Sequence, residues 1–394
     1  MTFSSRLKQL DQLLVETRSL WQPLPFTTAR PEWCKGYPEL TEALLYLDEN
    51  DIARYAVESD ALITFLSAYI PELAAISQLI ELPVAEAKPK HIKPRLHAGI
   101  PGRKWLQIKS LLASVDNPQQ AVTEWCGGKG YLGRLLATQW QQPVTTLEYN
   151  HELVDSVRKL ADKFNMNQQF VTVDVVSGPV SKYPKCSHPI ALHDCGELHR
   201  ELLRAIIRVK APGFTIVPCC YHLGRDQLYR AFNSGLKLKL SRDTLRLAVN
   251  ETVTAHNSEI QKRDQDMAWK LAFLQLREEL TGSSDYHPFK PVPKSWLDCS
   301  FEGYCCKLAE REKLPLPDKM DWKRYEAIGG LRHFEVVRLQ LLRHCFKRVL
   351  ELWLIMDMAV YLQANGYSVN VHTFCDRELT PRNILIEGKI KQLN

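Results

Sequence analysis

An acidic residue followed by closely spaced glycines gives the segment 122–133 (VTEWCGGKGYLG) the chemistry of a nucleotide-shaped pocket. Gly128 and Gly130 lack a Cβ, so the backbone can turn sharply and a ligand can approach the amide groups closely. A helix predicted from Tyr131 begins at this turn, and its free N–H groups point toward that ligand. Glu124 ends the strand before the turn. The sequence therefore predicts a ligand site where this strand ends.

The glycine spacing by itself fits two cofactors. Gly128-x-Gly130-x-x-Gly133 satisfies the dinucleotide fingerprint, and Glu148 lies twenty residues beyond Gly128, where a ribose-binding acid is expected for either cofactor. Glu124 separates them, because a carboxylate there repels the pyrophosphate of NAD but suits S-adenosylmethionine, which carries an ammonium, a sulfonium and no phosphate. We expect the methyl donor, with NAD and a purely structural glycine turn as alternatives.

Acidic residues end four successive strands of the predicted sheet. Strand-like apolar runs alternate with helical patterns in the middle of the chain, which is typical of a doubly wound α/β sheet. We expect strands at 121–125, 144–148, 170–174, 190–194 and 214–217, with helices at 131–137, 152–164 and 197–209. Ligands bind such sheets outside the carboxyl ends of the strands. The acids at those ends are Glu124, Glu148, Asp174 and Asp194.

Two segments follow the fourth and fifth strands, where the reacting atom of a bound donor would lie: 192–199 (LHDCGELH) and 218–222 (PCCYH). Methyl transfer from a sulfonium needs alignment of the acceptor and, for some acceptors, removal of a proton. Asp194, His193 or His222 could accept that proton, and Tyr221 could hold a planar substrate group by stacking. An ordinary structural role is the alternative for each of them.

Three cysteines, Cys195, Cys219 and Cys220, accompany these candidates. A thiolate is required to methylate C5 of a pyrimidine, and Cys219 is included among the catalytic candidates for that reason. We nevertheless expect direct in-line transfer, because consecutive side chains of an extended segment point to opposite sides. A zinc site completed by His222 is disfavoured by the adjacent pair and by the lack of a second CxxC. We therefore expect no metal, with buried structural thiols as the alternative.

Basic residues gather between 87 and 115 without an intervening acid: Lys88, Lys90, Lys93, Arg95, Arg103, Lys104 and Lys109. Such a stretch can follow a phosphate backbone and release its counterions. A late helix adds Arg338, Arg343, Lys347 and Arg348. We expect an RNA substrate, rRNA or tRNA, bound through 88–109. A solvated linker, a protein substrate, and a non-catalytic RNA-binding or ribosome-assembly factor that retains only the fold are the alternatives.

The composition narrows the cellular setting. The chain has 394 residues, a net charge of +6 and eleven cysteines, several adjacent, which would be hazardous in an oxidising compartment. Its first twenty residues lack the apolar core of a signal peptide. Its most apolar stretch, 349–362, contains Glu351 and Asp357, so a membrane span is not expected. We expect a cytoplasmic monomer.

The pattern along the chain predicts five segments. They are a helical N-terminal module at 1–86, a basic linker and helix at 87–118, the first part of the core at 119–225, an insertion at 226–332, and the end of the core at 333–394. The last segment is expected to hold one long helix at about 333–363 and two strands at 367–374 and 383–388.

Taken together, these pieces resemble the methyltransferase-like protein 25 family, whose wider domain also occurs in the glutathione-S-transferase-C-terminal-domain-containing protein. The matching segments are 126–130 (CGGKG), 192–196 (LHDCG), 219–222 (CCYH) and 379–383 (LTPRN). The resemblance implies a class I methyltransferase fold that binds S-adenosylmethionine. It places Glu124, Gly128 and Gly130 around the amino-acid end of the donor, Glu148 at the ribose and Asp174 near the adenine. Cys126, included in the donor site, stands where many such enzymes have their first glycine.

Overall fold

The computed structural model describes residues 1–88, 90–163, 166–249 and 257–391, and the chain divides into two compact units. Unit 1 comprises 1–16, 76–253 and 347–394, and unit 2 comprises 17–75 and 254–346. The limits of these units do not coincide with the predicted boundaries at 86, 226 and 332. Most of the predicted N-terminal module clusters with much of the predicted insertion, because their helices pack on one another.

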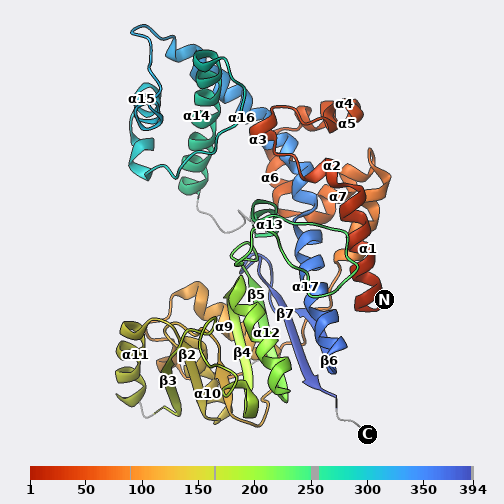
Figure 1. The fold of residues 1–394 in the computed structure, drawn as a ribbon, viewed down its shortest axis with the longest axis vertical. Helices are drawn as coiled ribbons and strands as arrows, with labels where there is room; N and C mark the ends of the chain where they lie inside the picture. Colours follow the sequence, from red (N-terminus) through yellow and green to blue (C-terminus); the bar gives the residue numbers. More distant parts are fainter. Residues whose placement is uncertain (89, 164–165, 250–256, 392–394) are drawn as a thin grey trace. The chain divides into compact units, whose positions relative to one another are not determined.

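A seven-stranded sheet forms the centre of the described part of unit 1, in the order β3-β2-β1-β4-β5-β7-β6 (Figure 1). The first five strands are parallel, and β7 runs antiparallel to both β5 and β6. The strands are β1 (Val122–Glu124), β2 (Val144–Glu148), β3 (Gln168–Thr172), β4 (His188–Cys195), β5 (Gly213–Cys219), β6 (Tyr367–Thr373) and β7 (Ile384–Ile390). The predicted doubly wound α/β class is confirmed. The strand order reverses between β1 and β4, where such sheets bind ligands.

Burial explains why these runs form strands. Every residue of β5 is buried, as expected of a parallel strand with both faces covered. The edge strand β6 instead alternates, with Tyr367, Val369 and Val371 buried and Ser368 and Asn370 exposed. The helices of unit 1 are α1 (Phe3–Glu16), α8 (Ala75–Ile80), η2 (Pro94–His97), α9 (Gly102–Ser114), α10 (Tyr131–Trp140), α11 (His151–Lys163), η3 (Pro184–Cys186), α12 (Glu197–Val209), α13 (Arg242–Val249) and α17 (Lys347–Ala364).

The long helix predicted at 333–363 is two helices, α16 (Trp322–Cys345) and α17. They meet at Phe346, whose N–H bonds to the carbonyl of Arg343 and so tightens the last turn of α16. Asp357 interrupts the apolar surface of α17, and its carboxylate accepts hydrogen bonds from the N–H groups of Phe232 and Asn233. No helix within the described ranges is long and apolar enough to cross a membrane.

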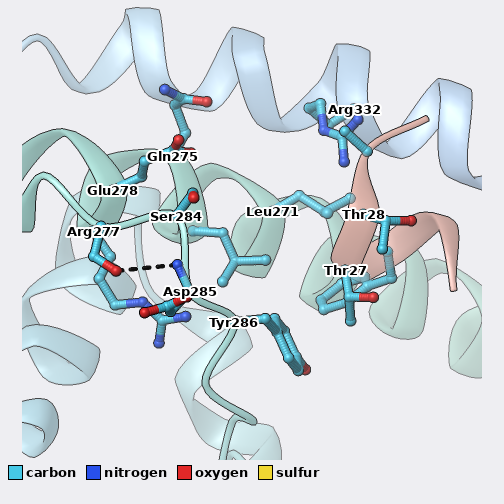
Figure 2. Close-up of a pocket in the computed structure, with 14 residues that line it drawn as sticks. Thr27, Thr28, Leu271, Gln275, Arg277, Glu278, Ser284, Asp285, Tyr286 and Arg332 are labelled. Atoms are coloured by element: carbon cyan, nitrogen blue, oxygen red, sulfur yellow. Dashed lines mark hydrogen bonds between the residues drawn. The ribbon is translucent and has the colours of Figure 1, made fainter. Parts of the chain in front are cut away.

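Unit 2 is helical in the residues that the structure describes. Its elements are α2 (Arg18–Trp21), α3 (Pro25–Thr28), α4 (Trp33–Gly36), α5 (Pro38–Tyr46), α6 (Glu49–Val57), α7 (Ser59–Ser67), η1 (Pro71–Ala74), α14 (Asn257–Thr281), η4 (Lys294–Asp298), α15 (Phe301–Glu312) and α16. A cavity of about 360 Å³ lies within this unit, with Thr27, Leu271, Arg277, Tyr286 and Arg332 around it (Figure 2). None of the site residues predicted above is among its described lining residues.

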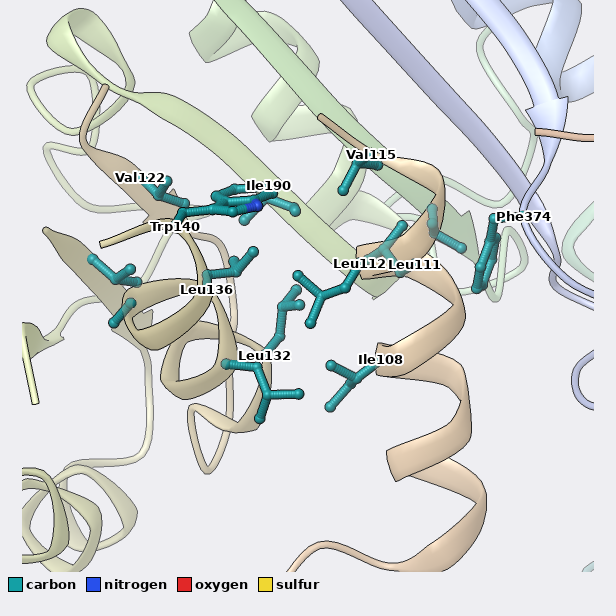
Figure 3. Close-up of a cluster of buried hydrophobic side chains, with 14 of the residues drawn as sticks. Ile108, Leu111, Leu112, Val115, Val122, Leu132, Leu136, Trp140, Ile190 and Phe374 are labelled. Carbon is teal, nitrogen blue, oxygen red and sulfur yellow. The ribbon is translucent and has the colours of Figure 1, made fainter. Parts of the chain in front are cut away.

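Helix α9 packs against α10 and the sheet in unit 1. Figure 3 shows Ile108 and Leu112 of α9 directed toward Leu132 and Leu136 of α10, with Ile190 of β4 in the same cluster. All five side chains are at most 3% exposed. This apolar contact sets the position of α9, and with it the polar side chains on its first turn.

Candidate active site

The glycines of the loop between β1 and α10 have two different roles. A Cβ on Gly130 would lie 2.5 Å from Cε1 of Phe170, and one on Gly133 would lie 2.4 Å from Oε2 of Glu124. A Cβ at either position would collide with side chains of the strands, so the loop and the start of α10 pack closely on them. Gly128 has a left-handed φ of +58°, and its Cβ would meet no described atom within 4 Å. Gly128 is therefore the glycine of this set that a ligand can approach.

Glu124 lies beneath this loop. Its side chain is 3% exposed, and its Oε2 accepts a hydrogen bond of 2.7 Å from Oγ1 of Thr146. Burial raises the pKa of this carboxyl to about 7, against the opposing effects of Thr146, the N–H of Gly133 and the charge of Lys104. Glu124 supports the loop from below, whereas the sequence reasoning expected its carboxylate to face the donor.

Glu148 ends β2 and holds the loop from the side. Its Oε2 accepts from the N–H of Gly128 at 2.9 Å, and its Oε1 accepts from the N–H of Asn150 at 3.0 Å. Glu148 is the register partner of Thr172 at the end of β3. The half-buried carboxylate therefore lies beside the open side of Gly128, at the sheet edge where a donor would bind.

Asp174 follows β3 by two residues and is half-buried. The hydroxyl of Ser177 and the N–H of Val176 donate to its carboxylate and hold its pKa below the usual range. Asp174 is ionised at neutral pH, and it lies at the same edge of the sheet as Glu148.

Cys126 precedes the glycines with a left-handed φ of +50°. Burial raises the pKa of its thiol, and the carboxylates of Asp194 and Glu148 add to this effect. The side chain therefore stays neutral and lies among residues at the ends of β1, β2 and β4.

Asp194 is buried near the end of β4, and its Oδ2 has no hydrogen-bond partner within the described ranges. Burial raises its pKa well above the usual value, while the ammonium of Lys104 opposes that shift. Burial likewise lowers the pKa of Lys104, against the charges of Glu124, Cys219 and Asp194. A buried carboxyl with an oxygen free of hydrogen bonds, which interacts with the charge of a half-buried amine, can hold or move a proton.

The basic pattern at 88–109 predicts that Lys104 contacts RNA and gives no sign that its ammonium interacts with Glu124, Cys219 and Asp194. Lys104 stands four, seven and eight residues before Ile108, Leu111 and Leu112, the buried apolar residues of α9. That spacing places it on the buried face of the helix. The amphipathic pattern was thus the signal that could have found it.

His193 forms a bulge in β4. Its φ is +66°, and the register between β4 and β5 shifts between Leu192 and Asp194. Its Nε2 lies 3.2 Å from Oε1 of Gln107. Because an amide oxygen only accepts, this contact assigns the proton to Nε2 and leaves Nδ1 as the acceptor. Burial, with the charges of Lys104 and Arg382, lowers the pKa of His193 to about 3, so the ring is neutral and a weak base.

Tyr221 is buried where the sequence reasoning expected a stacking wall for the substrate. It is 3% exposed, and its ring packs edge-on against His199 with the centroids 5.7 Å apart. Its hydroxyl donates to the carbonyl of Pro218 at 3.5 Å. His199 therefore already contacts the ring, and Tyr221 is also among the residues that line a pocket formed with α12 and the segment after β5.

The three cysteine sulfurs converge. Cys195 and Cys219 are register partners on β4 and β5 with sulfurs 3.4 Å apart, and the sulfur of Cys220 lies within 4.8 Å of both. The expectation that Cys219 and Cys220 face opposite sides is wrong, because it assumed extended backbone and Cys220 has a φ of +47°. Hydrogen bonds with the other two thiols lower the pKa of Cys220. His222 is not in this cluster, and its Nδ1 has no described hydrogen-bond partner.

Arginines of the late helices are structural. Arg338, Arg343 and Arg348 are 7%, 9% and 7% exposed. Arg338 and Arg343 donate from Nε to backbone carbonyls at 3.0 and 2.6 Å, and Arg348 pairs with Glu351 at 2.6 Å. The prediction that these three contact RNA is wrong, because their guanidinium groups satisfy buried acceptors.

The segment 88–109 keeps part of its exposed basic character. Lys93, Arg103 and Lys109 are exposed. Lys88 forms an exposed ion pair with Asp116. Lys90 is half-buried, and its ammonium donates a hydrogen bond to the carbonyl oxygen of Val115. Residue 89 and the side chain of Arg95 lie outside the described part of the chain.

A pocket of about 450 Å³ opens next to the ends of β4 and β5. Its lining comes from α12 and from the segment after β5. The described lining contains six arginines, Arg200, Arg204, Arg208, Arg225, Arg230 and Arg242, and three acids, Glu197, Glu201 and Asp226. Arginines outnumber acids in this lining, although Arg204 and Arg230 pair with acids of the pocket and Arg225 and Arg242 donate to backbone carbonyls.

The sequence reasoning missed these arginines as well. Arg200, Arg204 and Arg208 recur every four residues and so share one face of α12. Arg200 is 7% exposed, and its guanidinium lies over the rings of Tyr229 and Phe232 at 4.7 and 4.2 Å. Its Nη1 has no hydrogen-bond partner among the residues described.

The site residues fit S-adenosylmethionine. A Cβ at Gly128 would enter the open space beside the loop, so the loop leaves room for a ligand. Glu148 and Asp174 supply carboxylates at the same edge, suited to ribose hydroxyls and to the polar groups of the base. Cys126 and the buried carboxyl of Asp194 continue the site toward β4.

Residues 103–227 match a family model described as a methyltransferase domain. No curated protein matches the sequence. Solved structures with some likeness include precorrin-6y C5,15-methyltransferase from Geobacter metallireducens, at 12% identity and a TM-score of 0.26 over 30% of this chain and 63% of that one. A SAM-dependent methyltransferase from Aquifex aeolicus has 14% identity and a TM-score of 0.26 over 32% and 72%. The Pyrococcus abyssi tRNA (uracil-54, C5)-methyltransferase, in complex with S-adenosyl-L-homocysteine, has 20% identity and a TM-score of 0.23 over 30% and 28%.

The chain thus spans less than two thirds of the first and third of these structures. The domain match begins in α9, which carries Lys104, and ends beyond β5 in the arginine-lined pocket. It therefore includes the glycine loop, the acids at the strand ends and the three thiols. The chain therefore contains a methyltransferase domain at residues 103–227.

Proposed function

We propose that this chain is an S-adenosylmethionine-dependent methyltransferase that acts on RNA, either rRNA or tRNA, by direct in-line transfer of the methyl group. The arginine-lined pocket carries the proposal, because six arginines outnumber three acids in its lining, which includes α12 and the segment that follows β5. Guanidinium groups bind phosphate through paired N–H donors and stack on planar groups. A pocket with this charge favours a polyanionic acceptor over a neutral small molecule.

Helix α9 adds a second basic surface. Arg103 and Lys109 are exposed on the helix that brings Lys104 to the site. Trp105 is half-buried against the ring of His97, with their centroids 4.8 Å apart. Cations beside aromatic rings are typical of surfaces that bind single-stranded nucleic acid. This helix links a candidate backbone contact to the reacting centre.

Asp194 is the proposed proton acceptor for the methylated atom. When bound, S-adenosylmethionine supplies a methyl group already activated by its sulfonium, so the protein has to align the acceptor and accept its proton. Oδ2 of Asp194 has no partner in the described structure, and its raised pKa makes the ionised form a stronger base. Lys104 stabilises that ionised form.

We also propose membership of the methyltransferase-like protein 25 family and a monomer located in the cytoplasm. The four matched segments of the sequence support the family. All eleven cysteines lie within the described ranges and are free, which suits a reducing compartment. Light scattering on the purified chain and cell fractionation test the last two points.

The substrate class is tested by transferring labelled methyl groups from the donor into fractionated lysate of a deletion strain. Separate digestion with nuclease and with protease then shows which polymer carries the label. We expect the label to be released by nuclease. Release by protease alone would identify a protein substrate, and RNA binding without any transfer would identify a non-catalytic factor.

The pocket itself is tested by the salt dependence of RNA binding. Arg208→Ala and Arg230→Ala remove lining residues, while Arg246→Ala removes an exposed arginine of α13 outside the described lining. Each lining variant should weaken binding and lower the slope of log K against log salt by about one. Equal RNA affinities and equal salt slopes for all three variants would contradict a role for the pocket.

A further inference from the structure

The three thiol groups at the ends of β4 and β5 have the spacing of metal ligands. The sulfurs of Cys195, Cys219 and Cys220 lie within 4.8 Å of one another, and the closest pair is 3.4 Å apart. Zn–S bonds are about 2.3 Å long, so the sulfurs of a tetrahedral zinc site lie about 3.8 Å apart. The closest pair is about 0.4 Å shorter than this value and no pair is more than about 1 Å longer, so side-chain shifts of about 1 Å or less would bring all three sulfurs to it.

The backbone holds these cysteines in place before any metal binds. Cys195 and Cys219 face each other across two paired strands inside the sheet. The N–H of Gly196 donates to the carbonyl of Cys219, and the N–H of Leu223 donates to the carbonyl of Cys220. The left-handed turn at Cys220 brings its sulfur to the side of the other two. A preformed triad of this kind reduces the conformational cost of binding a metal.

The charge of the surroundings suits a thiolate-bound cation. Three thiolates and one Zn²⁺ carry a net charge of −1, which is costly in a partly buried site without a partner. Lys104 supplies that partner, because its ammonium lies close enough to Cys195 and Cys219 to interact with both. Zinc binds thiolate ligands readily, whereas the hard cations Mg²⁺ and Ca²⁺ prefer oxygen ligands.

We propose that Cys195, Cys219 and Cys220 bind one zinc ion and leave its fourth position open to water or to an atom of the acceptor. Binding forms three Zn–S bonds and releases the thiol protons to solvent, and nothing is oxidised or reduced. Three protein ligands with one open position are the arrangement of catalytic zinc sites. The site directly follows Asp194, so the metal would lie beside the methyl-acceptor position. This proposal is independent of the RNA substrate.

Zinc content tests the proposal. The full chain is purified under reducing conditions, exposed to zinc and dialysed, and its metal is measured by mass spectrometry. We expect one zinc per chain in the wild type, loss of the zinc in Cys195→Ser, Cys219→Ser and Cys220→Ser, and its retention in the control Cys186→Ser, which changes an exposed cysteine. Zinc retained in the three cluster variants, or absent from the wild type, would overturn the site.

Cobalt gives a test that requires no variant, which matters because Cys219 is buried in the sheet. Co²⁺ added to the reduced wild-type chain should produce thiolate-to-metal charge-transfer absorption and the visible bands of a tetrahedral ion. Added zinc should then abolish these bands. A spectrum of six-coordinate cobalt with oxygen ligands would overturn the proposal. So would a Cys195–Cys219 disulfide recovered by non-reducing peptide mapping from a chain that takes up no metal.

Discussion

Replacing Gly130 with alanine should destabilise unit 1 more than the same change at Gly128, although φ is left-handed at both positions, +61° and +58°. A non-glycine residue in this conformation costs roughly 1–2 kcal/mol. A Cβ at Gly128 meets no described atom within 4 Å, whereas at Gly130 it would lie 2.5 Å from Phe170 and 2.6 Å from Gln168. Overpacking adds about 1–3 kcal/mol. The expected losses are therefore about 1–2 kcal/mol for Gly128→Ala and about 2–5 kcal/mol for Gly130→Ala.

Donor binding should respond differently from stability at Gly128. The Cβ of Gly128→Ala enters the space that the loop leaves for the ligand, beside the carboxylate that holds the N–H of this residue. We expect donor affinity to fall by roughly tenfold or more, equivalent to about 1.4 kcal/mol, with most of the stability retained. At this position the loss of binding should therefore exceed what unfolding explains.

Urea denaturation of both variants gives their free energies of unfolding, and calorimetry with S-adenosylmethionine gives donor affinity. Equal losses of stability, or a larger loss for Gly128→Ala, would refute the argument from Cβ contacts. Wild-type donor affinity in Gly128→Ala would refute the conclusion that the donor approaches this glycine.

Three further outcomes are expected. Glu148→Ala should weaken donor binding by roughly 1–3 kcal/mol, because this carboxylate accepts a hydrogen bond from the N–H of Gly128 and is expected to bind the ribose. Calorimetry compares this variant with the control Glu152→Ala, which changes an exposed residue of α11. Equal donor affinities of the two variants would contradict a role for Glu148. Asp194→Asn should lose most of its turnover while still binding donor, and near-normal rates would remove Asp194 from the reacting centre. His188 has its pKa lowered by burial from 6.5 to about 4. Between pH 6.5 and about 4, the unfolded chain therefore binds more protons than the folded chain. The free energy of unfolding should fall by about 1.36 kcal/mol per pH unit across this range, or up to roughly 3 kcal/mol in total. Denaturation across this range should show a shallower pH dependence in His188→Gln, and an unchanged slope would contradict the assignment.

The sequence by itself determined those helices and strands whose formation is signalled by residues close together in the chain. The strand at 144–148 and the helix at 197–209 were predicted with the bounds that the structure has. Apolar runs, helical periodicity and turn glycines are local signals, so they remain visible in one dimension. For the same reason the glycine loop and its spacing to Glu148 could be recognised before any contact between them was known.

Only the tertiary structure decided which groups meet and which charges are buried. Lys104 enters the site because α9 turns its apolar face to the sheet, and Arg343 leaves the candidate surface because it donates to a carbonyl 322 residues away. The turn at Cys220 depends on one backbone angle, which brings two consecutive sulfurs to the same side. Such outcomes depend on side chains far apart in sequence that compete for the same buried space and hydrogen bonds, and a local pattern of residue types does not record that competition.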